Sequence, residues 1–586
     1  MRVRATGPRL SFRRPVSWPR WAGWPGWPGW LVCSLLAAAT AACAGSVDAS
    51  DGVGGGDGDG APGVGSCQSA SECPTGWFCN DFGRCEEPSP GGGGGPPAPE
   101  VEYVLGTPVS SQRYVYVALT EQDELARIDG YTGEVVARPV GDAPRDVGAI
   151  PGADGAVVLD ATNGTASIVR PAGSTDTVRV LPTLPRLNRL DLDPSGRFAV
   201  LWFDLAKAIA DGGIGGTGSF QDVTVLRLAP GGEKAVNLTV GFRPREVEFD
   251  ATGNRAYVIT EDGVSVIDLA IAVTSGPTIV PPIPVADPLA PPTSIEVDIV
   301  PSGDYAAVRR TGVSALRVVR LGASIPGQSQ GQMFDLPLAS PPTDIDLAPD
   351  GTRVYAVLRE AKQLAIVDVP GDVLDPTGVE LVDLASATVG SLVLSKDGRR
   401  ALLFTNATLD ERLTMIKLDQ PGYPAVTWPM KKAARAVGIS PTVTTALVLH
   451  AKAPGDPATA GTIDEYIDRS YGYSLIDLAT GFAKLQLTPV DPGPFAYAPD
   501  GSKVYVALDG GDAISATRAL QIVTAQTGVV TTKQLGSPPS AVGILPAAGQ
   551  AFAAQRHPLG RITFMNLATD ALRTVTGFDL NGDIVQ

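Results

Sequence analysis

A motif that recurs about every 48 residues determines what most of this chain can fold into. The motif is a tight turn, such as Asp-Pro-Ser-Gly or Ala-Pro-Asp-Gly, flanked by short apolar runs. Its glycines are 47 to 57 residues apart, except for one interval of 103 residues that spans two repeats; they are Gly196, Gly253, Gly303, Gly351, Gly398 and Gly501. With the weaker copies, we count ten units between residues 101 and 586. Most of the chain is therefore expected to be a repeat structure.

Each unit reads as four short β-strands. Proline presets φ and glycine accepts a positive φ, so the turn joins two antiparallel strands. The run at 247–249 alternates with period two before its turn, and the runs at 353–358 and 503–508 follow their turns with β-branched and aromatic residues. A third run follows, as in VSVIDLA at 264–270, and comparable runs with an Asp near the end occur in other units. Four strands in each repeat predict an all-β fold built from propeller blades.

These strings resemble the YVTN-type β-propeller repeats of secreted bacterial proteins, whose units run PDG-x-x-x-Tyr-Val and then Val-x-Val-Ile-Asp. The resemblance covers roughly residues 101–586 and implies a β-propeller. It implies no single activity, because this repeat serves lyases, haem-bearing reductases and surface adhesins. Ten blades exceed the usual four to eight, so we expect either one wide ring or two rings. The first unit lacks a first strand, and we expect the tail at 583–586 to supply it.

The first 42 residues predict export. Six arginines and no acid precede the uncharged run WLVCSLLAAATAA at 30–42, the pattern of a signal peptide. As a helix this run rises only about 20 Å, too short to span a bilayer. Thr40-Ala41-Ala42-Cys43 resembles a bacterial lipobox, so Cys43 is the expected lipidation site and the first mature residue. The alternative is ordinary cleavage at the same site, with Cys43 incidental.

A small cysteine-rich module lies between two linkers. Residues 43–66 are a flexible Gly/Asp-rich tether, residues 67–86 are the module and residues 87–100 are a Pro/Gly linker. Five residues separate each cysteine from the next, and the four are Cys67, Cys73, Cys79 and Cys85. An exported chain favours two disulfides, whose connectivity the sequence leaves open among three possibilities. Zinc is the alternative, although its ligand pairs usually have shorter spacings. The module resembles small Cys-rich modules of bacterial surface lipoproteins.

The net charge of the chain restricts the kinds of partner that it can bind. The chain has 46 Lys and Arg against 62 Asp and Glu, a formal net charge of −16. This disfavours nucleic acid, whose binding depends on neutralising phosphates. We expect contact with a membrane only through the lipid anchor, on the outer membrane or cell surface; a periplasmic or secreted location is the alternative. No cofactor and no metal are expected.

Catalytic residues are scarce. Only His450 and His557 are available as histidines, and both fall at the end of the second strand of their units. The YVTN resemblance implies that lyases with this repeat use a histidine on that face. A lyase or metal-assisted enzyme using these two residues is therefore the alternative function. We expect instead that each histidine is bonded to backbone or water.

Loop length points to a binding role. The loop between the second and third strands is long at 205–221, 451–472 and 509–519, whereas in most units it is short. Long loops on a rigid scaffold are where binding residues gather. The loop at 451–472 supplies the candidate binding residues, which are Asp464, Glu465, Tyr466, Asp468, Arg469 and Tyr471. We expect an exported binding or scaffold protein for a protein or polysaccharide partner, although a solvated insertion without a partner is the alternative.

Overall fold

The computed structural model describes residues 78–79, 85–86 and 109–578, apart from 121, 161, 173–174, 211–219, 288–293, 385–388, 510–516 and 558. The predicted signal peptide, Cys43 and the two linkers lie outside the described residues, as does most of the cysteine module. The chain forms two compact units, residues 19–98 and residues 1–18 with 99–586. Within the smaller unit, β1 (Phe78–Cys79) pairs antiparallel with β2 (Cys85–Glu86), and Cys79 lies opposite Cys85.

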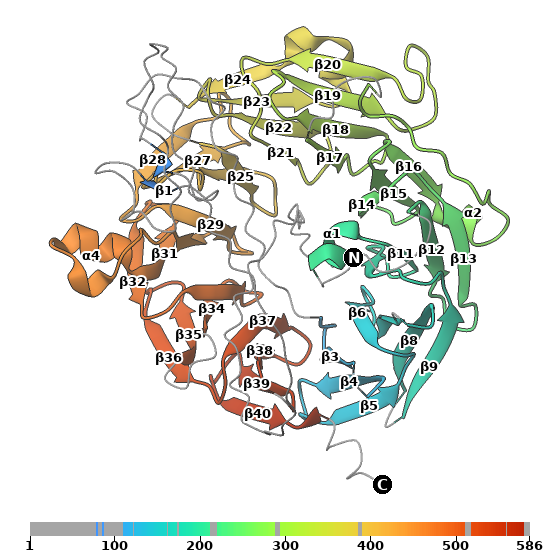
Figure 1. Ribbon diagram of the computed structural model, residues 1–586. Coiled ribbons are helices and arrows are strands. Elements are labelled where there is room, and N and C mark those ends of the chain that lie inside the picture. Colours follow the sequence, from blue (N-terminus) through green and yellow to red (C-terminus); the bar gives the residue numbers. More distant parts are fainter. Residues whose placement is uncertain are drawn as a thin grey trace, which may run out of the picture. The chain divides into compact units, whose positions relative to one another are not determined.

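Ten antiparallel sheets follow one another around a single ring in the larger unit, and we number them blades 1 to 10 (Figure 1). Blade 1 contains β3 (Tyr114–Leu119), β4 (Glu124–Asp129) and β5 (Val135–Pro139); blade 2 contains β6 (Pro144–Ala149), β7 (Ala156–Asp160), β8 (Thr165–Ala172) and β9 (Thr175–Pro182). Blade 3 contains β10 (Arg189–Leu192), β11 (Phe198–Trp202), β12 (Asp222–Arg227) and β13 (Lys234–Thr239); blade 4 contains β14 (Pro244–Phe249), β15 (Arg255–Thr260) and β16 (Val264–Asp268). Blade 5 contains β17 (Ile295–Ile299), β18 (Tyr305–Arg310), β19 (Ala315–Arg320) and β20 (Met333–Pro337).

The second half of the ring continues in the same order. Blade 6 contains β21 (Asp344–Leu347), β22 (Arg353–Leu358), β23 (Gln363–Asp368) and β24 (Glu380–Asp383); blade 7 contains β25 (Ser391–Leu394), β26 (Arg400–Phe404), β27 (Arg412–Lys417) and β28 (Ala425–Pro429). Blade 8 contains β29 (Ala434–Ile439), β30 (Thr445–His450), β31 (Tyr471–Asp477) and β32 (Ala483–Thr488). Blade 9 contains β33 (Pro492–Tyr497), β34 (Lys503–Asp509), β35 (Arg518–Thr524) and β36 (Val530–Gln534); blade 10 contains β37 (Pro539–Leu545), β38 (Gln550–Gln555), β39 (Arg561–Asn566) and β40 (Leu572–Thr576).

The prediction of an all-β propeller with about ten repeats is confirmed, and the open choice between one ring and two is settled as one ring. Among the described residues, eight blades have four strands, whereas blades 1 and 4 have three. In blade 4 one isolated bridge, between Ile283 and Val264 of β16, stands in place of the fourth strand, whereas Ile279 of the same proline-rich segment bridges to Thr239 of blade 3. Proline has no N–H to donate to a ladder, which explains the interruption. Among the described residues, no helix has the length and apolar character needed to cross a membrane.

The predicted turns lie between the first and second strands of their blades. All six turn glycines have a φ between 65° and 74°, a conformation that side chains with a Cβ rarely adopt. At Gly303 a Cβ would also overlap the hydroxyl of Tyr257 in the preceding blade, which donates a hydrogen bond to the Gly303 carbonyl (2.9 Å). This turn therefore joins two strands and fixes one blade against the next.

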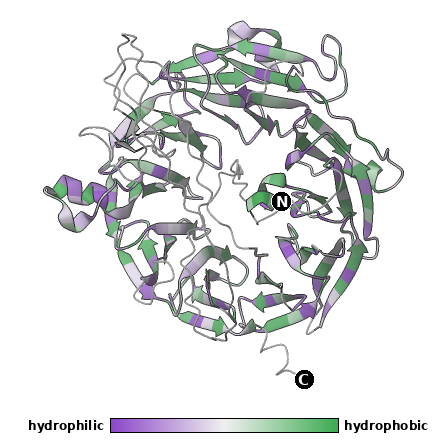
Figure 2. Ribbon diagram, in the orientation of Figure 1, coloured by the Kyte–Doolittle hydropathy of each residue, from purple (hydrophilic) through white to green (hydrophobic). Residues whose placement is uncertain are grey.

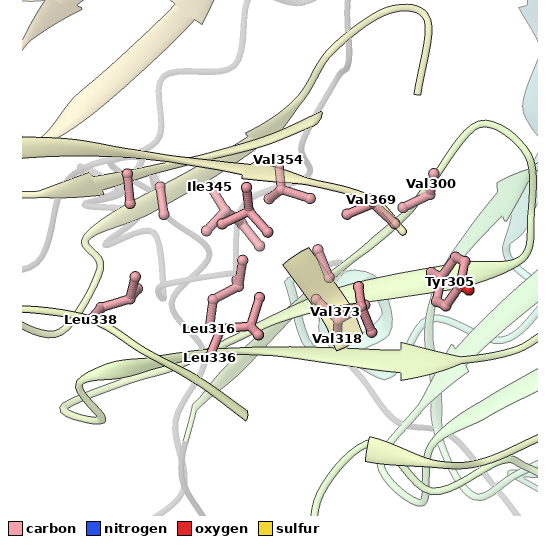
Figure 3. Packing of buried hydrophobic residues seen from close by; sticks show 14 of the residues in the cluster. Val300, Tyr305, Leu316, Val318, Leu336, Leu338, Ile345, Val354, Val369 and Val373 are labelled. Carbon is pink, nitrogen blue, oxygen red and sulfur yellow. The ribbon is translucent and has the colours of Figure 1, made fainter. Parts of the chain in front are cut away.

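The hydrophobic core lies between the blades, because each sheet buries both of its faces. Figure 2 shows hydrophobic residues along the strands of every blade. Between blades 5 and 6, Leu316 and Val318 of β19 face Ile345 and Val354 of the following sheet (Figure 3). A middle strand that packs on two neighbours must be apolar on both sides, which explains the continuous apolar runs of the repeats. Ten such contacts build the ring.

The ring closes between blades 10 and 1. Phe552 and Phe564 of blade 10 share one hydrophobic cluster with Val115 and Ile128 of blade 1. The Arg573 guanidinium also donates hydrogen bonds to the carbonyls of Gly130 (2.8 Å) and Tyr131 (3.0 Å). The predicted tail strand at 583–586 lies outside the described residues. Val109 and Ser110 lie along the inner edge of β3. The carbonyl of Val109 accepts a hydrogen bond from the N–H of Tyr116, and Ser110 forms an isolated bridge with Val115.

In the part of the chain that the structure describes, four short α-helices and two 3-10 turns connect the strands. They are α1 (Leu205–Ala210), α2 (Leu269–Ala272), α3 (Gly371–Leu374) and α4 (Ile463–Arg469), with η2 (Pro376–Gly378) and η3 (Pro457–Thr459). The sequence showed no convincing helical periodicity, and helices this short have too few turns to display it.

Candidate functional site

The insertion of blade 8, residues 451–470, is an ordered element between β30 and β31. It contains η3 and α4 where the sequence predicted only a long loop. The Thr462 hydroxyl accepts a hydrogen bond from the N–H of Glu465 (3.1 Å), and the Glu465 carboxylate accepts one from the N–H of Gly461 (2.6 Å). Thr462 is therefore the N-cap of α4, and Glu465 differs from the partner in a standard capping box only in accepting from the residue before the N-cap. The Thr-x-x-Glu spacing of 462–465 was the signal that could have predicted the helix.

Lys432 fixes the C-terminal end of α4. Its side chain is only 1% exposed, and its ammonium donates hydrogen bonds to the carbonyls of Ile467 (2.7 Å) and Asp468 (2.8 Å). Burial lowers the pKa of Lys432, and the nearby carboxylates of Asp468 and Glu411 oppose that shift. The last carbonyls of a helix carry partial negative charge, so a cation there is stabilising. The anchoring role of Lys432 could not be predicted from the sequence, because nothing local distinguishes it from its neighbour Lys431.

Further contacts hold the insertion in one conformation. Arg469 forms an ion pair with Glu465 one turn earlier and donates to the Thr459 hydroxyl (3.1 Å). The N–H of Ala453 donates to the carbonyl of Asp468 (2.8 Å), which closes the base of the insertion. The predicted residues Glu465 and Arg469 therefore stabilise the insertion itself.

The outer side of α4 presents apolar and acidic groups to solvent. Ile463 is 78% exposed and Tyr466 is 48% exposed. Asp464 is exposed beside them, and Asp468 is half-buried. Five of the six predicted binding residues therefore lie on α4. The sixth, Tyr471, begins β31, where the Lys452 ammonium lies 4.9 Å from its ring centroid.

The helices of two long loops lie at different distances from the centre of the ring. Figure 1 shows α1, from the predicted loop of blade 3, toward the centre of the ring, whereas α4 projects outside the circle of blades. Residues 510–516 of the third long loop lie outside the described residues. The expectation that the long loops share one face of the ring stays a prediction. Each loop follows the direction set by its own anchors, which for α4 include Lys432.

His450 is a structural residue of blade 8. It is 1% exposed, its Nδ1 lies 3.1 Å from the carbonyl oxygen of Ala433 and its Nε2 lies 2.7 Å from the hydroxyl of Ser474. Burial lowers the pKa of His450 to about 4. A neutral imidazole with both nitrogens engaged has no free atom to offer a substrate.

Other blades place a different polar residue at the position of His450. This position lies on the second strand, or directly at its end. It comes two residues after the residue that is paired with a Ser or Thr of the third strand. In blade 2, Asp160 accepts from Ser167 (3.1 Å), and in blade 10, Gln555 donates to Thr563 (2.6 Å). The position therefore bridges two strands at the end of the sheet and accepts several polar residue types.

His557 does not share the position of His450. It lies two residues beyond Gln555, which is the equivalent residue of blade 10, and its Nδ1 accepts a hydrogen bond from the N–H of Leu559 (3.1 Å). Its side chain is half-buried. Within the described part of the chain, no group of three or more His, Cys, Asp or Glu residues could hold a metal ion. The structure therefore does not bring the two histidines into equivalent places.

Comparisons with known protein families and with curated proteins find no match to this sequence. Among solved structures, the chain is similar to dihydro-heme d1 dehydrogenase NirN in complex with DHE, with a TM-score of 0.39 and 13% identity over 72% of each chain. It is also similar to the hydrazine synthase of Kuenenia stuttgartiensis, with a TM-score of 0.31 and 14% identity over 57% of this chain and 95% of that one. A eukaryotic initiation factor gives a TM-score of 0.42 and 10% identity over 80% and 98% of the two chains. These similarities assign no activity to the chain.

Proposed function

We propose that this chain is an exported, lipid-anchored binding protein whose ring of blades presents the blade 8 insertion to a protein or polysaccharide partner. One observation carries the proposal. The insertion is held in place by the N-terminal cap of α4 and by Lys432, yet it exposes Ile463 and Tyr466. A preordered surface loses little conformational entropy on binding, and exposed aromatic residues are common contact residues.

The repeat strings and the N-terminal pattern support the remaining parts of this proposal. The strings support membership in the YVTN-type propeller family. The apolar run before Cys43 supports export and lipidation, and the two predicted linkers would hold the ring away from a membrane. The alternative of a lyase or metal-assisted enzyme using His450 and His557 is not favoured, since the His450 ring is buried between Ala433 and Ser474.

Binding through the insertion is tested on the full chain with Cys43→Ser, which keeps it soluble. Residues 454–468 are replaced by a short Gly-Ser linker in a background with Lys432→Met, so that no buried ammonium is left without its carbonyl partners. Lys432→Met alone is the matched control. Glycan arrays and pull-downs of cell-surface proteins should find a partner that the control retains and the shortened variant loses. Equal binding by the two variants would refute the role of the insertion, and no partner for the unmodified chain would contradict a binding function.

The lipid anchor is tested in cells by labelling with a lipid precursor. The wild-type chain should incorporate the label and fractionate with membranes, whereas the Cys43→Ser variant should do neither. Equal labelling of the two chains would contradict lipidation at Cys43 and would favour a soluble periplasmic or secreted protein.

A further inference from the structure

The connection from blade 1 to blade 2 has a close counterpart between blades 3 and 4. The two segments read VGDAPR and VGFRPR, and we name them connector 2 and connector 4; they are residues 140–145 and 240–245. In each connector the glycine N–H donates a hydrogen bond to a serine of the third strand, from Gly141 to Ser167 (3.2 Å) and from Gly241 to Ser265 (3.0 Å). The two connections therefore share one local geometry.

Asp160 in blade 2 takes the place of Thr260 in blade 4. Each is paired with the connector proline, and a Cβ on the connector glycine would lie 2.3 Å from an oxygen of either side chain. The two residues are buried, with exposed fractions of 1% and 0%. In blade 4 the hydroxyls donate to main-chain carbonyls, Thr260 to Gly263 (2.9 Å) and Ser265 to Val280 (2.9 Å). The blade 4 site is therefore neutral, and each hydroxyl has an acceptor.

In blade 2 the corresponding hydroxyls converge on a carboxyl group. Thr165 (3.0 Å) and Ser167 (3.1 Å) both donate to Oδ2 of Asp160. Within the part of the chain that the structure describes, the other oxygen, Oδ1, is buried and has no hydrogen-bond partner. An ionised carboxylate in this position is buried with half of its accepting capacity unused, which is unfavourable. A protonated carboxyl could instead donate to either hydroxyl oxygen.

The nearest charge described around Asp160 is also negative. Burial raises the pKa of Asp160 to about 6, the hydrogen bonds from Thr165, Ser167 and the connector oppose that shift, and the charge of Asp142 adds to it. Asp142 follows the connector glycine directly, and its carboxylate accepts a hydrogen bond from the neutral amide of Asn163. Connector 2 therefore holds two carboxyl groups close together, one exposed and one buried.

The other charged groups on the elements around Asp160 have contacts of their own or face solvent. Asp123, in the turn of blade 1, accepts from a connector N–H (2.8 Å), and Asp146 of β6 accepts from the N–H of Leu190 (2.9 Å). Arg145 of β6 is exposed. Arg186, in the connection to blade 3, is half-buried and has a contact of its own. Among the described charges, Asp142 acts most strongly on Asp160.

We propose that Asp160 makes the connection between blades 1 and 2 a pH-sensitive device. In mildly acidic solution the carboxyl takes a proton from solvent, donates to Thr165 or Ser167 and no longer repels Asp142, so connector 2 stays closed over it. In neutral solution the buried charge favours opening of connector 2, because opening gives the carboxylate access to water. Connector 4 lacks this property, since Thr260 carries no charge. The device is independent of the proposed binding function.

Hydrogen exchange of the full Cys43→Ser chain at pH 5 and pH 7.5 tests the device, with rates corrected for the intrinsic pH dependence of exchange. Closed connector 2 binds the proton with a pKa of about 6 and the open form with the ordinary value of 3.8, so opening should become about tenfold more frequent at pH 7.5. Connector 4 is the internal control and should not change. Local exchange is measured because His450 changes global stability with the opposite sign in this pH range. Equal responses of the two connectors would overturn the inference.

Exchanging the two residues locates the titrating group. Asp160→Thr, which carries the residue of blade 4, should abolish the pH response of connector 2, and Thr260→Asp should give connector 4 a response of the same sign. Asp142→Asn should keep the response and move its midpoint to lower pH, because a neighbouring negative charge is removed. A response that survives Asp160→Thr, or one that Asp142→Asn abolishes, would overturn the inference.

Discussion

Lys432 shows how one buried side chain determines the place of a whole insertion. Its ammonium donates to both carbonyls at the end of α4, which also accept from the backbone N–H groups of Ser470 and Ala453, and it reaches them from the loop between blades 7 and 8. A buried cation without such partners would be strongly unfavourable. The position of α4 outside the ring therefore depends on a residue that precedes it by about thirty positions along the chain.

Lys432→Met should loosen α4 without unfolding the ring. The substitution removes the two hydrogen bonds from the charged ammonium and leaves each carbonyl with its backbone donor alone, at a cost of about 1–3 kcal/mol. Hydrogen exchange of residues 463–470 should become faster, while the middle strands of blade 8 keep their protection. Lys431→Met, at the exposed neighbour, is the control and should leave exchange unchanged. If the two variants behave alike, Lys432 does not anchor the insertion.

His450 should make stability fall in mild acid. Burial holds its folded pKa at about 4, below the ordinary value of 6.5, so between these values the unfolded chain binds a proton that the folded chain does not. Stability due to this residue is full above about pH 6.5 and is lost as the pH falls to about 4, by about 3 kcal/mol in total. Urea unfolding should show a shallower loss for His450→Gln, which carries the residue found at position 555. His557→Gln is the control, and an identical pH slope for His450→Gln and the wild type would contradict this role.

At the scale of elements, carboxylates on the innermost strands join successive blades. Asp344 of β21 accepts a hydrogen bond from the N–H of Leu392 in β25 (2.8 Å). Asp146 accepts in the same way from Leu190 (2.9 Å), and Glu248 accepts from Ile299 (3.1 Å). The inner edge of a blade has no neighbouring strand, so these side chains supply acceptors to N–H groups that the sheet leaves unpaired.

Asp344→Ala should destabilise the ring through this contact. The N–H of Leu392, a buried residue, would lose its charged acceptor, at a cost of about 1.5–3 kcal/mol. Asp344→Asn keeps an oxygen acceptor and should cost less. The midpoint of urea unfolding measures the difference. Equal midpoints for the two variants would show that the hydrogen bond contributes little.

The sequence predicted the strands and turns of most blades because their signals are local. A turn glycine or an alternating run is recognisable from a few neighbouring residues, as at 347–358. The role of His450 was not recognisable, because its partner Ser474 is 24 residues away on another strand. The irregular fourth strand of blade 4 and the direction of α4 also depend on contacts far along the chain. The candidate site was therefore predicted as a loop, but its helix, its anchor and its exposed face were not.

At the scale of the whole molecule, the sequence indicated ten repeats but left the number of rings open. Closure depends on the angle between successive blades, which is set by side-chain packing such as that between blades 5 and 6 (Figure 3). A small change in this angle, repeated ten times, would decide whether the last blade reaches the first. The contacts of Phe552 and Arg573 with blade 1 show that the ring closes.

The cysteine module should form its disulfides independently of the ring. Residues 86–586 contain no cysteine, and β1 and β2 place Cys79 opposite Cys85. Facing residues of an antiparallel pair have Cα atoms about 4.5–5.5 Å apart, within the range for a disulfide. Non-reducing peptide mapping should find two disulfides among the four cysteines, with the register of β1 and β2 favouring a Cys79–Cys85 link, and reductant should not change the melting temperature of the ring. Four free thiols, or a melting temperature of the ring that falls with reductant, would contradict this organisation.

Hydrogen exchange of the full Cys43→Ser chain, with and without the cell-surface protein or glycan found by the pull-downs and arrays, tests the central claim that the molecule binds through blade 8. The partner should slow exchange in α4, because this helix exposes Ile463 and Tyr466. Exchange in α1 and around His557 should stay the same. Slower exchange at α1 or His557, with α4 unchanged, would contradict the account and move the binding site to the centre of the ring or to blade 10.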